Sequence, residues 1–110
     1  MKNFYKKADI ILVKFPFTNA SEFKVRPALV IRDQNDDDLN VLPISTKINL
    51  GRQDIIIQKE NYSGEVLPVE SVIRLTKITT IHSELVIKKV SALKSTFFKE
   101  VQLSLFRYLS

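Results

Sequence analysis

The stretch Lys24-Val25-Arg26-Pro27-Ala28-Leu29-Val30-Ile31 places a cation and a proline at the start of an apolar strand. The residue before a proline is pushed into an extended conformation, so the backbone of Arg26 has little freedom. Proline is tolerated as the first residue of a strand, and we predict that this strand runs from Pro27 to Arg32. The planar guanidinium of Arg26 then has a restricted direction and suits a phosphate, although an ordinary surface arginine also explains the stretch.

Outward from this stretch, short apolar segments rich in β-branched residues predict a chain made mainly of strands. The expected strands are residues 10–15, 27–32, 39–44, 54–58, 71–75 and 85–93. Residues 17–25 are predicted to form a polar loop, and residues 33–38, rich in Asp and Asn, a turn. Alternation along the strand 71–75 would place Val72 and Arg74 on one side and Ile73 on the other, which carries Arg74 out of the core toward a groove.

One helix is expected at the end of the chain, with Ser95 as its N-cap. Apolar residues recur there at helical spacing, namely Phe97, Phe98, Val101, Leu105, Tyr108 and Leu109. Many short strands, few glycines and this helix predict a small, partly open β-barrel with a helix packed on it, formed by residues 1–110 as a single domain. The helical stripe and Phe23 belong either to the core or to a homodimer surface.

Charge and composition narrow the class of protein. The 110 residues carry a formal net charge of +5 and a pI near 9.6, a surplus that favours RNA or DNA as a partner. Cysteine is absent, which excludes a disulfide framework, a thiolate nucleophile and a Cys-ligated zinc site. The N-terminal segment has no continuous apolar signal region, and the apolar run 10–13 is too short to span a bilayer, so we predict a cytoplasmic protein.

Several catalytic chemistries find little support in the sequence. A calcium loop begun at Asp33 would need glycine and glutamate where the chain has Asp38 and Ile44. A Ser-His-Asp hydrolase built on Ser45 and His82, the only histidine, would lack the G-x-S-x-G turn. The chain has two glycines and no glycine-rich phosphate-binding motif, which argues against nucleotide hydrolysis. We therefore expect neither a metal nor a cofactor.

What remains is a set of basic and hydroxyl-bearing residues at strand ends, namely Arg26, Ser45, Thr46 and Arg74, with Lys24 and Lys47 beside them. Such groups suit cleavage of a phosphodiester by its own 2′-hydroxyl, which needs phosphate positioning and stabilisation of transition-state charge. Arg26 is always charged, so it would stabilise that charge and would be a poor general base. Ser45 would hydrogen-bond the phosphate, or else it only caps the end of its strand.

Several segments, each weak alone, together resemble the MazF/PemK family of toxin endoribonucleases. They follow the family order over nearly the whole chain: Ala8-Asp9-Ile10-Ile11-Leu12-Val13, Phe15-Pro16-Phe17-Thr18, Arg26-Pro27-Ala28-Leu29-Val30-Ile31, Leu42-Pro43-Ile44-Ser45-Thr46, Ser71-Val72-Ile73-Arg74 and Ile78-Thr79-Thr80-Ile81. The resemblance implies an SH3-like barrel of the MazF/PemK/CcdB type, and a homodimer with an RNA groove across its interface. It also implies metal-independent cleavage of single-stranded RNA, often mRNA, at short sequences, and neutralisation by a cognate antitoxin.

Carried over by position, the resemblance implies that Arg26 is the catalytic arginine and Ser45 the catalytic hydroxyl, with Thr46 as the alternative register. Arg74 matches an arginine that some PemK members use. The residues expected to bind RNA are Phe17, Phe23, Lys24, Lys47, Arg74 and Lys77.

The chain departs from the family pattern at three positions. Ala8 stands where glycine is usual, which affects only the turn before the first strand. Thr76 stands where some members carry a functional acid, so no acid-base role transfers to that position. His82 replaces a common aspartate and is interpreted as a structural or surface residue.

Three functions stay open at this point. The first is a sequence-specific endoribonuclease toxin, and the second is the gyrase-poisoning branch of the same fold, which relies on a C-terminal tryptophan that this chain lacks. The third is a non-catalytic RNA-binding barrel. The presence of both Arg26 and Ser45 favours the nuclease over the non-catalytic barrel.

Overall fold

The structure is a computed structural model, and it describes residues 4–16, 23–33, 37–47 and 53–110. The elements in chain order are β1 (Asp9–Pro16), β2 (Phe23–Asp33), β3 (Asp38–Ser45), β4 (Ile55–Ile57), the 3-10 helix η1 (Lys59–Asn61), β5 (Ser71–Ile73), β6 (Thr79–His82), the 3-10 helix η2 (Ser83–Leu85), β7 (Val86–Ala92) and α1 (Ser95–Leu109). The predicted mainly β fold with a C-terminal α-helix is confirmed.

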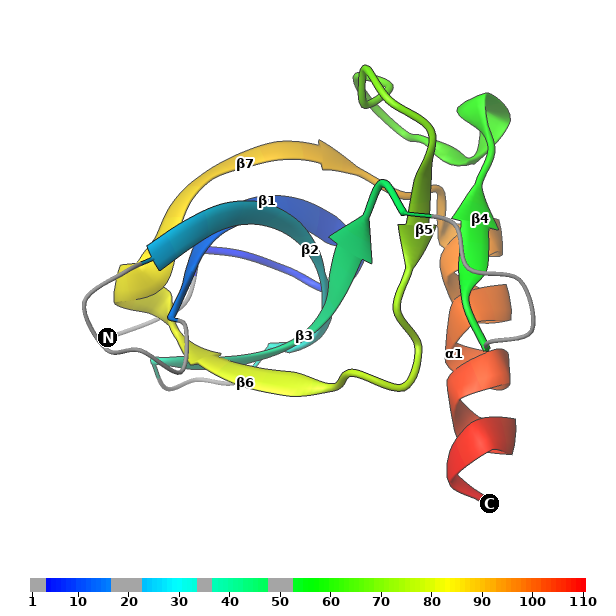
Figure 1. Cartoon of the computed structure of the whole chain (residues 1–110). Coiled ribbons are helices and arrows are strands. Elements are labelled where there is room, and N and C mark those ends of the chain that lie inside the picture. The colour runs from blue at the N-terminus through cyan, green and yellow to red at the C-terminus, as the bar shows by residue number, and fades with distance from the viewer. Residues whose placement is uncertain (1–3, 17–22, 34–36, 48–52) are drawn as a thin grey trace.

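The strands form an antiparallel sheet that curls on itself without closing (Figure 1). Its order is β4-β5-β3-β2-β1-β7, and β6 pairs with β3 outside this path. β3 changes partner along its length, because Asp38 to Val41 pair with β6 whereas Ile44 and Ser45 pair with β5. The curl gives the sheet a concave face and a convex face, and it carries the end of β3 away from β2.

The concave face encloses one of the two apolar clusters. Its buried residues come from β1, β2, β3 and β6, and they are Ile11, Val13, Ala28, Val30, Leu39, Val41 and Ile81. Their neighbours Ile10, Leu29 and Leu42 point to the opposite face and belong to the second cluster. β1 and β2 are therefore covered on both faces, which explains why their sequences are almost continuously apolar rather than alternating.

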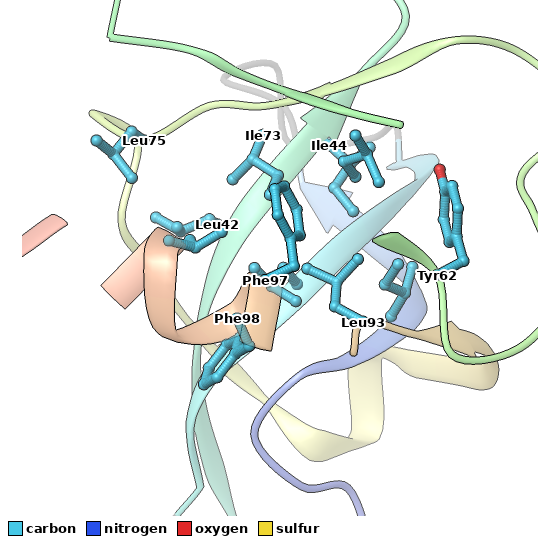
Figure 2. Close-up of a cluster of buried hydrophobic side chains, with 12 residues drawn as sticks. Leu42, Ile44, Tyr62, Ile73, Leu75, Leu93, Phe97 and Phe98 are labelled. Carbon is cyan, nitrogen blue, oxygen red and sulfur yellow. The ribbon is translucent and has the colours of Figure 1, made fainter. Parts of the chain in front are cut away.

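The larger cluster lies between the convex face and α1 (Figure 2). Phe97, Phe98 and Val101 are the buried residues of α1. Figure 2 shows Phe97 and Phe98 among side chains from the sheet, such as Leu42 and Ile73. Because burial of a large apolar side chain contributes about 1.5–3 kcal/mol, these three residues fasten the first half of the helix to the sheet.

The predicted strands 10–15, 39–44, 54–58 and 85–93 are confirmed, and each of their ends shifts by one residue. The predicted loop 17–25 is wrong at its end, because β2 already begins at Phe23 and pairs with β1 as far as Pro16↔Phe23. Pro27 is consequently inside β2 and not its first residue. It is tolerated there because β2 pairs with β3 only from Ala28 onward, so Pro27 has one neighbouring strand instead of two.

The strand predicted at 71–75 is shorter than expected and does not alternate. β5 ends at Ile73, and Ser71, Val72 and Ile73 are all buried, so the strand is covered on both faces. Arg74 follows the strand and lies outside both apolar clusters, as predicted. β6 was not predicted as a strand, because its four residues offer only one buried position, Ile81, against a polar background.

The predicted helix is confirmed, but its start and its apolar stripe differ from expectation. Lys94 occupies the N-cap position, without a side-chain cap, and Ser95 is the first helical residue. Backbone bonds hold Leu93 to the Ala8 carbonyl and Lys94 to the Asn61 carbonyl, so the extended chain continues one residue further than the sequence indicates. Tyr108 and Leu109, predicted to extend the stripe, are exposed. Within the described ranges, no helix is long and apolar enough to cross a membrane.

Candidate functional site

Arg26 and Ser45 come to the same end of the sheet. The pairing of β2 with β3 ends at Ala28↔Pro43, and Arg26 and Ser45 lie two residues beyond that pair on their strands. Side chains alternate along a strand, and Ala28, Val30 and Val41 belong to the concave face, so Arg26 and Ser45 continue that face. Two predicted site residues that are remote in sequence therefore lie beyond the same end of the β2–β3 pairing.

A hollow of about 380 Å³ adjoins this end of the sheet. Pro27 and Thr46, the chain neighbours of Arg26 and Ser45, both line it, so the two segments border the same hollow. The remaining lining is mostly apolar and consists of Leu12, Glu65, Val66, Leu67, Pro68, Val69, Ser71 and Val90. Thr46 itself is exposed, and its role as an alternative to Ser45 stays a prediction.

The Ser45 hydroxyl is held by two donors. The Lys47 backbone N–H donates to Ser45 Oγ at 3.1 Å, and Arg74 Nη2 donates to the same atom at 3.3 Å. Arg74 Nη2 also donates to the Lys47 carbonyl at 2.9 Å. The backbone N–H of Arg74 donates to the Pro43 carbonyl, so the chain after β5 is tied to β3 just before Ser45. The structure therefore joins Ser45, Lys47 and Arg74 in one network.

Asp54 completes this network, and the sequence did not single it out. Its carboxylate accepts a hydrogen bond from Arg74 Nη1 at 2.5 Å, and the side chains of the pair are only 14% and 7% exposed. Register explains the contact, because β4 pairs with β5 at Ile55↔Ile73 and Asp54 and Arg74 are the next residues on each strand. In the sequence, Asp54 is only an acidic residue directly before an apolar strand. Its contact with Arg74 cannot be predicted until the partner strand is known.

The other predicted RNA-binding residues lie around this end of the sheet with different exposures. Phe23 is 57% exposed at the start of β2, and Lys24 is exposed beside it. Lys47 is exposed just past Ser45, and Lys77 is exposed in the turn after Arg74, where its N–H donates to the Arg74 carbonyl. Arg26 is half-buried, and its side chain forms no hydrogen bond or ion pair with any other described residue. Phe17 lies outside the described residues.

His82 is remote from this network. It pairs with Asp38 at the start of β3, whereas Ser45 is the last residue of that eight-residue strand. At about 3.3 Å per residue the two are separated by roughly 20 Å along the strand, which rules out a Ser45–His82 hydrogen bond. His82 instead accepts a hydrogen bond at Nδ1 from the Glu84 N–H and lies 3.9 Å from Asp37, so it caps η2 and has the structural role predicted for it.

These elements define a class of protein: a small curled β-sheet, backed by one C-terminal helix, that carries arginines and a hydroxyl at an open end. Arginines and a hydroxyl in this arrangement can bind a phosphate group and stabilise added negative charge. The family comparison is more specific. The model of the PemK-like, MazF-like toxins of type II toxin-antitoxin systems matches residues 6–109, and the chain belongs to this family.

Solved structures of similar shape share the fold at low identity. The Mycobacterium tuberculosis toxin MazF-mt6 is 16% identical with a TM-score of 0.71, over 90% of this chain and 93% of that one. MazF from Deinococcus radiodurans is 13% identical with a TM-score of 0.76, over 98% of each chain. An endoribonuclease in complex with its cognate antitoxin, from a mycobacterial species, is 8% identical with a TM-score of 0.75. The match covers 96% of this chain and 94% of that one. A search of curated protein sequences found no match.

Proposed function

We propose that this toxin is a metal-independent, sequence-specific endoribonuclease that cleaves single-stranded RNA and so inhibits translation and growth. The observation that carries the proposal is the placement of Arg26 and Ser45 at one end of the sheet, on the same face, with Arg74 donating to Ser45. The names of the structural neighbours, which include endoribonucleases, agree with it.

In the proposed reaction the 2′-hydroxyl of one nucleotide attacks the adjacent phosphorus. The O2′–P bond forms as the 2′-hydroxyl loses its proton to solvent, and the P–O5′ bond breaks as O5′ takes up a proton. The products are a 2′,3′-cyclic phosphate and a 5′-hydroxyl end. Arg26 stabilises the negative charge on the phosphorane-like transition state, and Ser45 hydrogen-bonds a phosphate oxygen. Arg26 suits this task because it is half-buried and no described residue pairs with its guanidinium.

The substrate and partners follow from the same proposal. Single-stranded RNA is recognised by stacking and by base-edge contacts, for which exposed Phe23 and the cations Lys24, Lys47 and Lys77 are the described candidates. The cognate antitoxin is the expected protein partner, since one neighbour is an endoribonuclease in complex with its antitoxin. We further propose a homodimer that acts in the cytoplasm.

The test is incubation of purified protein with a long single-stranded RNA in EDTA, followed by mapping of the cut ends. Wild type is compared with Arg26→Ala and Ser45→Ala, and with Arg107→Ala, which removes an exposed arginine from the last turn of α1. We expect discrete cuts with 5′-hydroxyl ends from wild type and Arg107→Ala, and a loss of about 100-fold or more in rate from Arg26→Ala.

Two outcomes would contradict the proposal. If folded wild type cuts no RNA, with or without added Mg²⁺, the protein is not a nuclease. It would then act by binding a target instead of cleaving it. If it cuts only with Mg²⁺, the metal-independent mechanism is wrong even though the activity is present.

A further inference from the structure

The Ser45 hydroxyl has a hydrogen-bonding direction that its neighbours impose. A serine hydroxyl can accept at two lone pairs and donate one O–H. Arg74 Nη2 and the Lys47 N–H both donate to Ser45 Oγ, so both acceptor positions are used. The remaining capacity of Ser45 is to donate its own proton, which is what an anionic phosphate oxygen requires.

This arrangement depends on where the Arg74 guanidinium lies. Arginine has a long side chain with many rotamers, and a guanidinium held at only one nitrogen can still rotate. Arg74 Nη1 is bound by Asp54, which leaves Nη2 for Ser45 Oγ and the Lys47 carbonyl. Because the guanidinium is planar, fixing both terminal nitrogens sets the orientation of the whole group.

Burial limits how much the ion pair of Asp54 and Arg74 can add to the stability of the fold. The pair is mostly removed from water, and the desolvation of two charges offsets much of their attraction. Both residues lie one step past a paired position of β4 and β5, so the sheet itself fixes their backbones. This ion pair, with backbones fixed by strand register and a guanidinium that donates to Ser45, is suited to position that hydroxyl.

We propose that Asp54 is a positioning residue for RNA cleavage: it holds Arg74 so that Arg74 and the Lys47 N–H keep Ser45 as a hydrogen-bond donor to the substrate phosphate. This inference rests on the proposed function. Asp54 does not touch the substrate in this scheme. Loss of Asp54 should therefore lower the rate of the chemical step, and it should do so only when Ser45 is present.

The test compares Asp54→Asn, Asp54→Glu and the control Asp37→Asn in wild-type and Ser45→Ala backgrounds. Asp37 is a suitable control because it lies just before β3, at the end of that strand opposite Ser45, with a side chain that is 45% exposed. Cleavage rates are measured under single turnover with excess protein. Affinity is measured with an oligonucleotide that carries a 2′-deoxy nucleotide at the mapped cut site and cannot react.

We expect Asp54→Asn to slow cleavage roughly 30- to 100-fold, since a small misplacement near the reacting atoms is enough for a loss of this size. Affinity for the 2′-deoxy oligonucleotide should change less than about threefold, and in the Ser45→Ala background the same substitution should cost less than about threefold in rate. Asp54→Glu keeps the charge but moves the carboxylate by one methylene, so its cleavage rate should lie between those of Asp54→Asn and wild type. Asp37→Asn should match wild type.

Each other result would overturn the inference. A rate for Asp54→Asn within about twofold of wild type, or an equal loss with and without Ser45, shows that Asp54 does not act through the hydroxyl. An equal loss in affinity and rate makes it a binding residue, and failure of both Asp54 variants to fold makes it a structural one. If wild type cuts no RNA, the proposed function fails too, whereas wild-type cutting beside an unaffected Asp54→Asn removes this inference alone.

Discussion

At the scale of single residues, Ala8 occupies a conformation that glycine adopts more easily. Its φ is 77°, and Ala8 is the one non-glycine residue in the described part of the chain with a positive φ. The Ala8 N–H donates to the Val30 carbonyl, and the Ala8 carbonyl accepts from Leu93, so the turn is held between β2 and the segment before α1. The replacement of the glycine usual in the family therefore leaves local backbone strain at the start of β1.

Ala8→Gly should consequently stabilise the protein. A left-handed conformation costs a residue with a Cβ about 1–2 kcal/mol, and glycine loses about 0.5–1 kcal/mol more entropy on folding, so we expect a net gain of roughly 0.5–1 kcal/mol. Urea unfolding measures it. Ala92→Gly, in the extended strand β7, is the matched control and should destabilise. A loss of stability in Ala8→Gly would show that the turn carries no strain.

The phenol of Tyr62 should make the stability of the protein change with pH in the alkaline range. Burial raises the pKa of its phenol above the ordinary value of 10.0, while hydrogen bonds with the Ser71 side chain and the Leu67 backbone lower it in part. The folded state then holds the proton more tightly than the unfolded chain, so the stability contributed by the neutral phenol is present below pH 10.0 and is lost as the pH rises through and above that value.

The comparison of wild type with Tyr62→Phe checks this sign. The free energy of unfolding of wild type, minus that of the variant, should shrink between about pH 8 and about pH 10.5, because phenylalanine cannot ionise. Urea unfolding at the two pH values measures the difference. A difference that grows with pH would mean that the folded state favours the phenolate.

At the scale of elements, α1 divides into a half that is part of the core and a half that is not. Phe97, Phe98 and Val101 pack on the convex face and Leu105 is partly buried against the same cluster, whereas Leu103, Phe106 and Leu109 are exposed. Figure 1 shows the C-terminal turns of the helix reaching past the start of β4. The predicted apolar stripe is thus covered as far as Leu105, and its last members Tyr108 and Leu109 are exposed.

Two phenylalanines of α1 make this division testable. Phe97 is 9% exposed and Phe106 is 69% exposed. Phe97→Ala should lower the free energy of unfolding by about 3–5 kcal/mol, as is usual for an aromatic residue lost from a core, and Phe106→Ala by less than about 0.5 kcal/mol. Both are measured by urea unfolding at low protein concentration. Equal losses would mean that the end of the helix is covered in solution.

At the scale of the whole molecule, the proposed function predicts that positive charge and an aromatic residue make different contributions to RNA affinity. The chain carries a net charge of +5, and Arg26 is at the end of the sheet where Phe23 is exposed. A phosphate contact releases bound counterions and so makes affinity depend on salt, whereas stacking on an aromatic ring does not. The two kinds of contact can therefore be separated by one titration.

For a non-cleavable 2′-deoxy oligonucleotide, we expect Arg26→Ala to reduce the slope of log affinity against log salt by about 0.7, the value for one phosphate contact on a single strand. Phe23→Ala should weaken binding by about 1–3 kcal/mol at every salt concentration, with the slope unchanged. Fluorescence anisotropy across a salt series measures both. An unchanged slope in Arg26→Ala would remove this residue from the phosphate site.

The sequence by itself determined the mainly β fold and the C-terminal helix, and it supplied the candidate residues for a phosphate site. β-branched runs and a helical apolar stripe are local patterns, so they predicted β1, β3, β7 and α1. The same patterns placed the start of β2 too late and missed β6, because polar strands are made by pairing with a neighbour rather than by their own composition.

Only the tertiary structure decided how the site is assembled. The resemblance pointed to Arg26, Ser45 and Arg74, but it held no information on which of them touch. The β2–β3 register brings Arg26 to the end of the sheet where Ser45 lies, and the β4–β5 register sets Asp54 opposite Arg74. Strand register depends on pairing between distant segments, and this is why Asp54 had no visible role in the sequence and acquires one in the fold.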